Sequence, residues 1–211
     1  QMLNLLEIYP DVISDGALNI PESGNGKSDL WDELKYELDW VMTMQDDDGG
    51  VFFKLTALGF GGFIMPEDYN LDRYIIGKST ASSLDFAAVL AQASRLSQNI
   101  DPEWSEKALE ASKNAWKWAS VNDNIAFKNP KGVSTGEYGD NVFSDDFYWA
   151  AAELYIATQE EIYLNYLNSN PQQYQHELTD SWKQFVRNTA FHSLLENKDL
   201  LNEEFASSLV A

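Results

Sequence analysis

The clearest pattern in the chain is an apolar stripe between residues 30 and 45. Leu30, Leu34 and Leu38 follow one another at intervals of four residues, and Val41 comes three residues later. These intervals place the side chains on one face of an α-helix. A second stripe on another face of the same helix consists of Tyr36, Trp40 and Met44. Two stripes predict a helix that packs on two sides, as in a layered all-helical domain.

Similar periodicity, with turn residues between the segments, predicts helices along most of the chain. The predicted segments are 1–9, 79–98, 102–118, 145–158, 160–167 and 171–195. Long loops are predicted at residues 10–28, 58–77 and 120–143. Side chains suited to capping precede several of these helices, namely Ser28, Ser79 or Thr80, Asp101 and Ser144.

The segment 79–98 has almost no polar face, so we expect a helix that is buried on nearly all sides. Asp85 is the exception within it. A buried carboxyl group needs either hydrogen-bond donors or a cation nearby, so Asp85 must have a partner. A short extended run at 51–56, after the turn at 46–50, predicts a small hairpin element in an otherwise all-α fold.

Composition excludes several classes of function. Asp and Glu number 34 against 14 Lys and Arg, which gives a formal net charge of −20. A phosphate backbone or an anionic membrane surface would be repelled, so no nucleic-acid or membrane partner is expected. The chain has no cysteine, which excludes disulfides, thiolate metal sites and thiol catalysis. The acidity itself is explained by solubility, or by the binding of a hard cation.

Several short motifs occur in a specific order. Ile20-Pro-Glu-Ser-Gly-Asn-Gly is followed by Asp32-Glu-Leu-Lys-Tyr-Glu-Leu-Asp-Trp and by Asp48-Gly-Gly-Val-Phe-Phe-Lys. Later come Met65-Pro-Glu-Asp, Thr135-Gly-Glu-Tyr-Gly-Asp and Trp149-Ala-Ala-Ala-Glu-Leu-Tyr. Together these motifs, from about residue 5 to about residue 160, resemble the family 9 glycoside hydrolases, which are inverting enzymes of the cellulase type.

The resemblance implies an (α/α)6 barrel of inner and outer helices. The predicted helices make up about half of the twelve that a whole barrel needs, so residues 1–211 are expected to form a single, incomplete catalytic-domain segment. Such a half-barrel would expose apolar faces. We therefore expect it to contact the remaining half of the domain or to self-associate.

The catalytic residues implied by the resemblance have no counterpart here. The water-activating aspartates of the family lie in an Asp-Ala-Gly-Asp motif before the Pro-Glu-Ser-Gly stretch, and the acid is a glutamate near the far end of the domain. Neither group can be placed on this chain, so its catalytic residues are unknown. Adjacent acids, Glu67-Asp68 and Glu160-Glu161, are interpreted as solvated surface charges.

Substrate and metal sites are predicted from the resemblance as well. Tyr138 and Trp182 are candidate sugar-binding residues, although core packing or loop anchoring would explain both equally well. Phe53 stands where the family usually has histidine, so a hydrogen bond to a sugar hydroxyl is lost there. Asp145 and Asp146 match an acidic doublet that binds calcium in related enzymes, but the helix dipole alone also favours acids in a first turn. No cofactor is expected for the chemistry, and structural calcium is the one candidate metal.

The leading hypothesis is a segment of a secreted or periplasmic enzyme that cleaves β-1,4-glucan, such as cellulose, with inversion. On this hypothesis the chain alone is expected to be inactive. The alternative is a non-catalytic carbohydrate-binding or scaffold half-barrel. A related specificity, such as xyloglucan or an exo-acting glucosaminidase, is a third interpretation.

Overall fold

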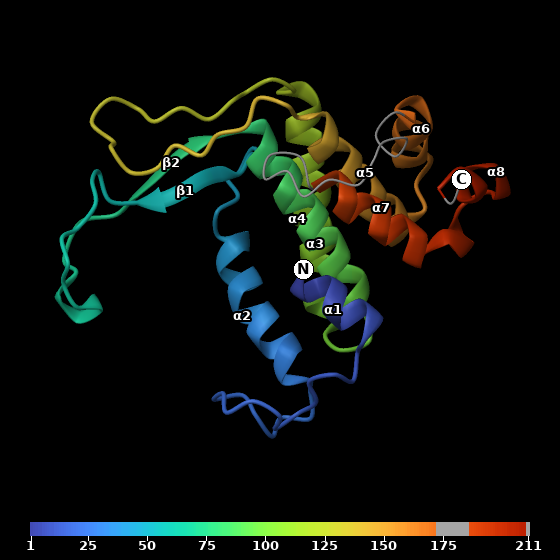
Figure 1. Ribbon diagram of the computed structural model, residues 1–211, viewed down its shortest axis with the longest axis horizontal. Helices are drawn as coiled ribbons and strands as arrows, with labels where there is room; N and C mark the ends of the chain where they lie inside the picture. The colour runs from blue at the N-terminus through green and yellow to red at the C-terminus, as the bar shows by residue number, and fades with distance from the viewer. Residues whose placement is uncertain (172–185, 210–211) are drawn as a thin grey trace.

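The computed structural model describes residues 1–171 and 186–209, and it is mostly helical (Figure 1). The α-helices are α1 Met2–Ile8, α2 Asp29–Met42, α3 Thr80–Ser97, α4 Pro102–Val121, α5 Ser144–Thr158, α6 Glu161–Ser169, α7 Val186–Glu196 and α8 Glu203–Ser208. Strands β1 Phe52–Thr56 and β2 Tyr74–Lys78 and the short 3-10 helices Pro66–Asp68 and Lys198–Leu200 complete the order. The fold is thus all-α with a small hairpin, as the sequence predicts. The helix predicted at 171–195 is seen only as α7, since residues 172–185 lie outside the described part.

Helix α3 is the centre of the core and packs against both α4 and α5. Its alanines make this possible, because small side chains let helices approach closely. Ala87, Ala88 and Ala91 are fully buried. Ser112 of α4 donates a hydrogen bond across the contact to the Ala87 carbonyl at 2.5 Å. The nearly complete burial predicted for this helix is confirmed.

The predicted caps at Ser79 and Asp101 are confirmed by side-chain hydrogen bonds. Ser79 accepts a hydrogen bond from the Ser82 amide at 3.1 Å, and Asp101 accepts one from the Trp104 amide at 3.2 Å. Ser28 is in the cap position of α2 but makes no capping hydrogen bond, and its hydroxyl donates instead to the Ile13 carbonyl. The cap predicted at Ser144 was wrong, because Ser144 is already the first residue of α5.

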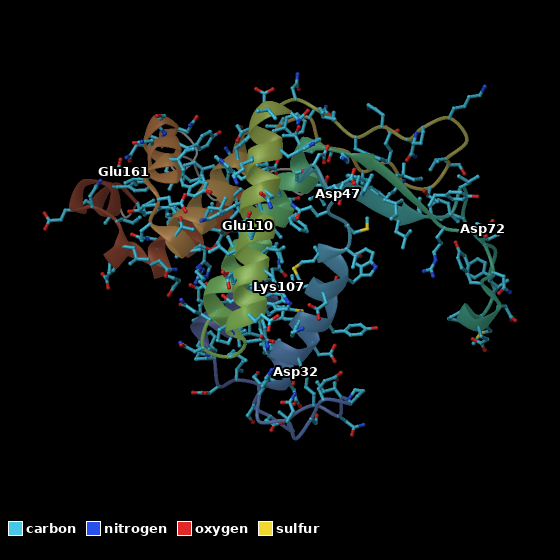
Figure 2. All side chains as sticks on the ribbon, turned by 180° about the vertical axis from the view of Figure 1, so that it is seen from behind. Asp32, Asp47, Asp72, Lys107, Glu110 and Glu161 are labelled. Carbon is cyan, nitrogen blue, oxygen red and sulfur yellow. The ribbon has the colours of Figure 1, made fainter. Side chains whose placement is uncertain are left out.

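The two strands pair antiparallel, with Phe52 opposite Lys78 and Thr56 opposite Tyr74. Residues 58–73 connect them in an extended segment, here called the arm, which projects away from the helices (Figure 1). Figure 2 shows Asp72 on the arm at the far side of the molecule. The prediction of an irregular loop through residue 77 was therefore wrong at its end, where Tyr74–Lys78 form β2.

Helix α2 packs on one face only, which corrects the prediction that it packs on two. Leu30, Leu34 and Leu38 are buried as predicted. In the second stripe only Met44 is buried, whereas Tyr36 is 79% exposed and Trp40 is 49% exposed. The helical spacing of apolar residues predicts the helix and its two apolar faces, but it does not show which other elements cover each face.

A buried ionic network connects four helices that are distant in sequence. The Arg95 guanidinium of α3 contacts a Glu7 carboxylate oxygen of α1 at 2.5 Å and the Glu153 carboxylate of α5 at 3.2 Å. Glu153 is fully buried and also accepts a hydrogen bond from Ser193 of α7. Burial raises the pKa of Glu7, but Arg95 and the amides of Asn197 and Gln92 outweigh it and hold that pKa below its usual range.

None of the helices in the described residues is both long enough and apolar enough to cross a bilayer. Several charged side chains lie on the outer surface. Figure 2 shows Lys107 and Glu110 on the outer side of α4, Asp47 in the turn after α2 and Glu161 at the start of α6.

Candidate functional site

A cleft of about 1070 Å³ lies between α2 and α3, beneath β1 and the loop that precedes α5. Its volume is at the upper end of the range for small-molecule sites in proteins. Leu34, Leu38, Val41 and Val89 give it apolar walls. Its aromatic and acidic lining residues include Phe53, Asp85, Tyr138, Asp140 and Asp146, and Glu33 and Glu37 of α2 also line it. Tyr138 and Asp146, two of the four residues predicted from sequence, therefore share one cleft.

Tyr138 presents an exposed aromatic ring to this cleft. Its side chain is 76% exposed, and its backbone has a φ of +28°, an unusual value for a residue other than glycine. The ring lies directly over Gly136, where a Cβ atom would be only 2.0 Å from the nearest ring carbon. The position of this ring therefore depends on the absence of a side chain at Gly136.

Phe53 forms the aromatic wall next to β1. Its ring stacks on that of Phe127 with centroids 3.8 Å apart and planes 8° from parallel. Phe127 is buried, so the pair is anchored in the body of the protein. A phenylalanine offers no hydrogen-bonding group, so Phe53 gives the cleft an apolar surface.

Carboxyl groups form the floor of the cleft. Asp85 of α3 and Asp146 of α5 hydrogen-bond to each other, which requires one of the two to be protonated. Burial raises the pKa of Asp85 to about 7, and the charges of Asp145 and Asp140 act in the same direction. Burial, followed by the charge of Asp85, raises the pKa of Asp146 to about 9. The partner that Asp85 needs is thus a second carboxyl group.

The predicted calcium ligands are both buried in the first turn of α5. Calcium requires six to eight oxygen ligands. Within residues 1–171 and 186–209, no three Asp, Glu, His or Cys side chains are grouped so that they could hold a metal ion. Asp146 is moreover engaged with Asp85. The described donor set does not fit calcium, and the metal role of Asp145 and Asp146 stays a prediction.

The other candidates lie elsewhere. Trp182, the second predicted sugar-binding residue, falls outside the described residues. Glu67 and Asp68 are exposed on the arm, and Glu160 precedes α6 and forms an ion pair with Lys113 at 2.6 Å. Neither acidic pair lines the cleft, in agreement with their interpretation as surface charges.

Sequence reasoning missed how the loop that carries Tyr138 is held. The Lys54 ammonium of β1 donates to Asn129 Oδ1 at 2.8 Å, to Thr135 Oγ1 at 3.1 Å and to the Gly136 carbonyl at 2.7 Å. The only signal in the sequence was a lysine within the otherwise apolar run Val51-Phe-Phe-Lys-Leu. Nothing local to that run indicates contacts about 80 residues away.

The chain is similar to known proteins in sequence and in fold. The chain is 44% identical over 173 residues to a xyloglucan-specific endo-beta-1,4-glucanase of Bacteroides ovatus, an alignment that covers 77% of the chain and 30% of that protein. It is 41% identical over 160 residues to Endoglucanase D of Acetivibrio thermocellus, covering 75% of the chain and 26% of the relative. The chain thus spans less than a third of the length of these relatives.

Solved structures match over nearly the whole chain. A family 9 glycoside hydrolase from Bacteroides ovatus superposes with a TM-score of 0.89 at 37% identity, and the match covers 99% of this chain and 40% of the other. A metagenome-derived glycoside hydrolase family 9 endoglucanase gives 0.88 at 29% identity, with 99% and 38% covered. The sequence profile described as "Glycosyl hydrolase family 9" matches residues 1–208. The chain therefore belongs to glycosyl hydrolase family 9.

Proposed function

We propose that this chain supplies part of the glucan-binding cleft of a β-1,4-glucanase. Family membership and the endoglucanase activity named for its relatives support this function. The observation that carries the proposal is the position of the Tyr138 ring, which lies exposed in a cleft with a polar floor. Pyranose rings have apolar C–H faces and hydroxyl edges. An aromatic ring can stack on the C–H face, and carboxyl groups in the same cleft can hydrogen-bond to the hydroxyls.

The carboxyl pair Asp85 and Asp146 is not suited to inverting hydrolysis. That reaction needs two carboxyl groups about 6.5–9.5 Å apart, with room for a water between the sugar and the base. Asp85 and Asp146 hydrogen-bond to each other, so they are too close to serve as such a pair. We therefore assign substrate binding, and not proton transfer, to the described cleft, and we propose that the inverting carboxylates belong to other segments of the enzyme.

Equilibrium binding combined with a reducing-sugar assay tests this function. The chain is titrated with cellohexaose, with xyloglucan oligosaccharides and, as a control for linkage, with maltohexaose. The proposal predicts saturable binding of a β-1,4-linked oligosaccharide, no binding of maltohexaose and no release of reducing sugar by the chain alone. Failure to bind any β-1,4-glucan would contradict it.

A non-catalytic carbohydrate-binding half-barrel is the second candidate. Phe53 favours it, because this cleft residue can offer a sugar hydroxyl no hydrogen bond. The coding sequence on either side of this segment separates the two candidates. An Asp-Ala-Gly-Asp motif upstream supports the enzyme, whereas its absence supports the binding module.

We also propose that the enzyme acts outside the cytoplasm, either secreted or in the periplasm, because β-glucan polymers are extracellular substrates. Immunodetection of the protein in culture medium and cell fractions tests this. Detection only in the cytoplasmic fraction would contradict the proposal.

A further inference from the structure

One lysine of β1, Lys54, makes several contacts to loop 127–138. The Lys54 ammonium has three N–H donors, and the structure gives it three acceptors in this loop, on Asn129, Thr135 and Gly136. The ammonium also lies 5.2 Å from the centroid of the Phe127 ring, within range of a cation–π interaction. Lys54 therefore contacts Phe127 and Asn129 near the start of the loop and Thr135 further along it. It also contacts Gly136, over which the Tyr138 ring lies.

Further hydrogen bonds close the loop around this lysine. Asn129 donates from its side chain to the Thr135 carbonyl at 2.6 Å, and its backbone amide donates to the Glu137 carboxylate at 2.8 Å. Thr56 of β1 donates to Thr135 Oγ1 at 3.1 Å. These bonds fix residues 129–137, so the backbone that enters Tyr138 has a defined position.

Tyr138 itself needs such support. A positive φ at a non-glycine residue costs free energy and persists only where the surroundings impose it. The ring fits over Gly136 because that residue has no Cβ, and the Gly136 carbonyl is one of the groups bound by Lys54. The same ammonium therefore anchors the residue that supports the ring.

We infer that Lys54 is a positioning residue, which ties loop 127–138 to β1 and thereby holds the Tyr138 ring in the cleft for contact with a glucan chain. This inference rests on the function proposed above. Lys54 does not line the cleft, and all three of its donors are engaged, so direct binding of the sugar by this ammonium is not part of the inference.

A double-mutant cycle on cellohexaose affinity tests the inference. Lys54→Met keeps the length of the side chain but removes the donors, and we expect it to weaken binding about five- to tenfold, or roughly 1–1.4 kcal/mol. In a Tyr138→Ala background the same substitution should have less than a twofold effect, because the coupled residue is gone. Lys131→Met, an exposed lysine of the same loop, is the matched control and should leave affinity unchanged.

Gly136→Ala provides a second variant in case Lys54→Met fails to fold. The added methyl group would meet the Tyr138 ring, which is the movable end of a side chain, and displace it. Affinity should fall to the level of Tyr138→Ala, with no further loss when the two are combined. The inference would be overturned if Lys54→Met or Gly136→Ala weakened cellohexaose binding as much in the Tyr138→Ala background as in the parent.

Hydrogen exchange of the free protein separates failure of this inference from failure of the proposed function. Lys54→Met should speed amide exchange in residues 134–140 while α3 and α5 keep the exchange rates of the parent. This readout needs no ligand, so it decides the inference even if the parent binds no glucan. Unchanged exchange in residues 134–140 would contradict the positioning role.

Discussion

Asp85 and Asp146 make the charge of the cleft floor depend on pH. An unperturbed aspartate has a pKa of 3.8, whereas Asp85 in the folded protein has a pKa of about 7. Between these pH values the folded protein holds a proton that the unfolded chain has released. The free energy of unfolding therefore falls as pH rises from about 4 to about 7. The proton on Asp146, whose pKa is about 9, extends this fall to about pH 9.

Asp85→Asn should reduce this loss of stability. Asparagine cannot ionise and can still donate a hydrogen bond to Asp146, so the variant should be more stable than the parent at pH 8, by on the order of 1–3 kcal/mol. That corresponds to a rise in Tm of about 2–4 °C per kcal/mol. At pH 4 the two proteins should melt within a degree or two of each other, as judged by circular dichroism.

The control is Asp123→Asn, which neutralises an exposed acid and should show no such pH dependence. If Asp145 and Asp146 bound calcium, the parent Tm would instead rise on addition of calcium and fall with a chelator. A Tm of Asp85→Asn below that of the parent at pH 8 would contradict the carboxyl pair.

At the scale of single residues, the sequence shows that a buried polar group requires an interaction partner, but it does not show which residue that partner is. An acid in a nearly all-apolar helix must have a partner, and Asp85 has one. Its identity as Asp146 depends on how α3 and α5 are placed in space, which no local pattern encodes. The same holds for Tyr138, whose ring is placed by Gly136 nearby and by Lys54 at a distance.

Among the helices, the ion pairs of Arg95 connect α1, α3 and α5, and Ser193 adds α7. Breaking such a network by removing one partner is costly, because an uncompensated charge remains buried. Here that charge is on Glu153, which is fully buried.

Arg95→Met should therefore lower the free energy of unfolding by about 3–5 kcal/mol. Addition of Glu153→Gln to this variant should recover part of the loss, because the buried charge is then removed. Urea denaturation monitored by tryptophan fluorescence measures both. Lys117→Met, an exposed position on α4, is the control, and a loss for Arg95→Met no larger than that of the control would contradict the account.

The elements themselves are largely predictable. The periodicity at 30–45 and 79–98 reflects burial on a helix face, and the caps at Ser79 and Asp101 act locally. Strand β2 was missed because Tyr74–Lys78 alternates poorly and contains a glycine at a positive φ of 58°. Helix α8 was missed because six residues carry too little periodicity to be recognised.

For the molecule as a whole, many exposed apolar side chains lie on the arm, and two more lie on α2. On the arm, Phe60 is 75% exposed and the Phe63 side chain is fully exposed; on α2, Tyr36 is 79% exposed. Large exposed apolar patches are uncommon on soluble monomers and mark interaction sites or surfaces prone to association. We therefore keep the prediction of self-association and assign it to these surfaces.

Light scattering after size-exclusion chromatography tests this at micromolar concentration. The mass should exceed the 23.9 kDa of one chain and should decrease towards it when Phe60 and Phe63 are both changed to Ser. Val121→Ser, which removes an exposed apolar side chain from the end of α4, should leave the mass unchanged. A mass of one chain for the parent at all concentrations would contradict the prediction.

The central claim is that the cleft beside Tyr138 binds a β-1,4-glucan. Isothermal titration of cellohexaose into the parent, Tyr138→Ala and Tyr36→Ala tests it most directly, because both variants lose an exposed tyrosine ring but only Tyr138 lines the cleft. The account predicts a Kd at least about tenfold weaker for Tyr138→Ala, equivalent to about 1.4 kcal/mol, and an unchanged Kd for Tyr36→Ala. Equal affinities for all three proteins, or no binding by the parent, would contradict it.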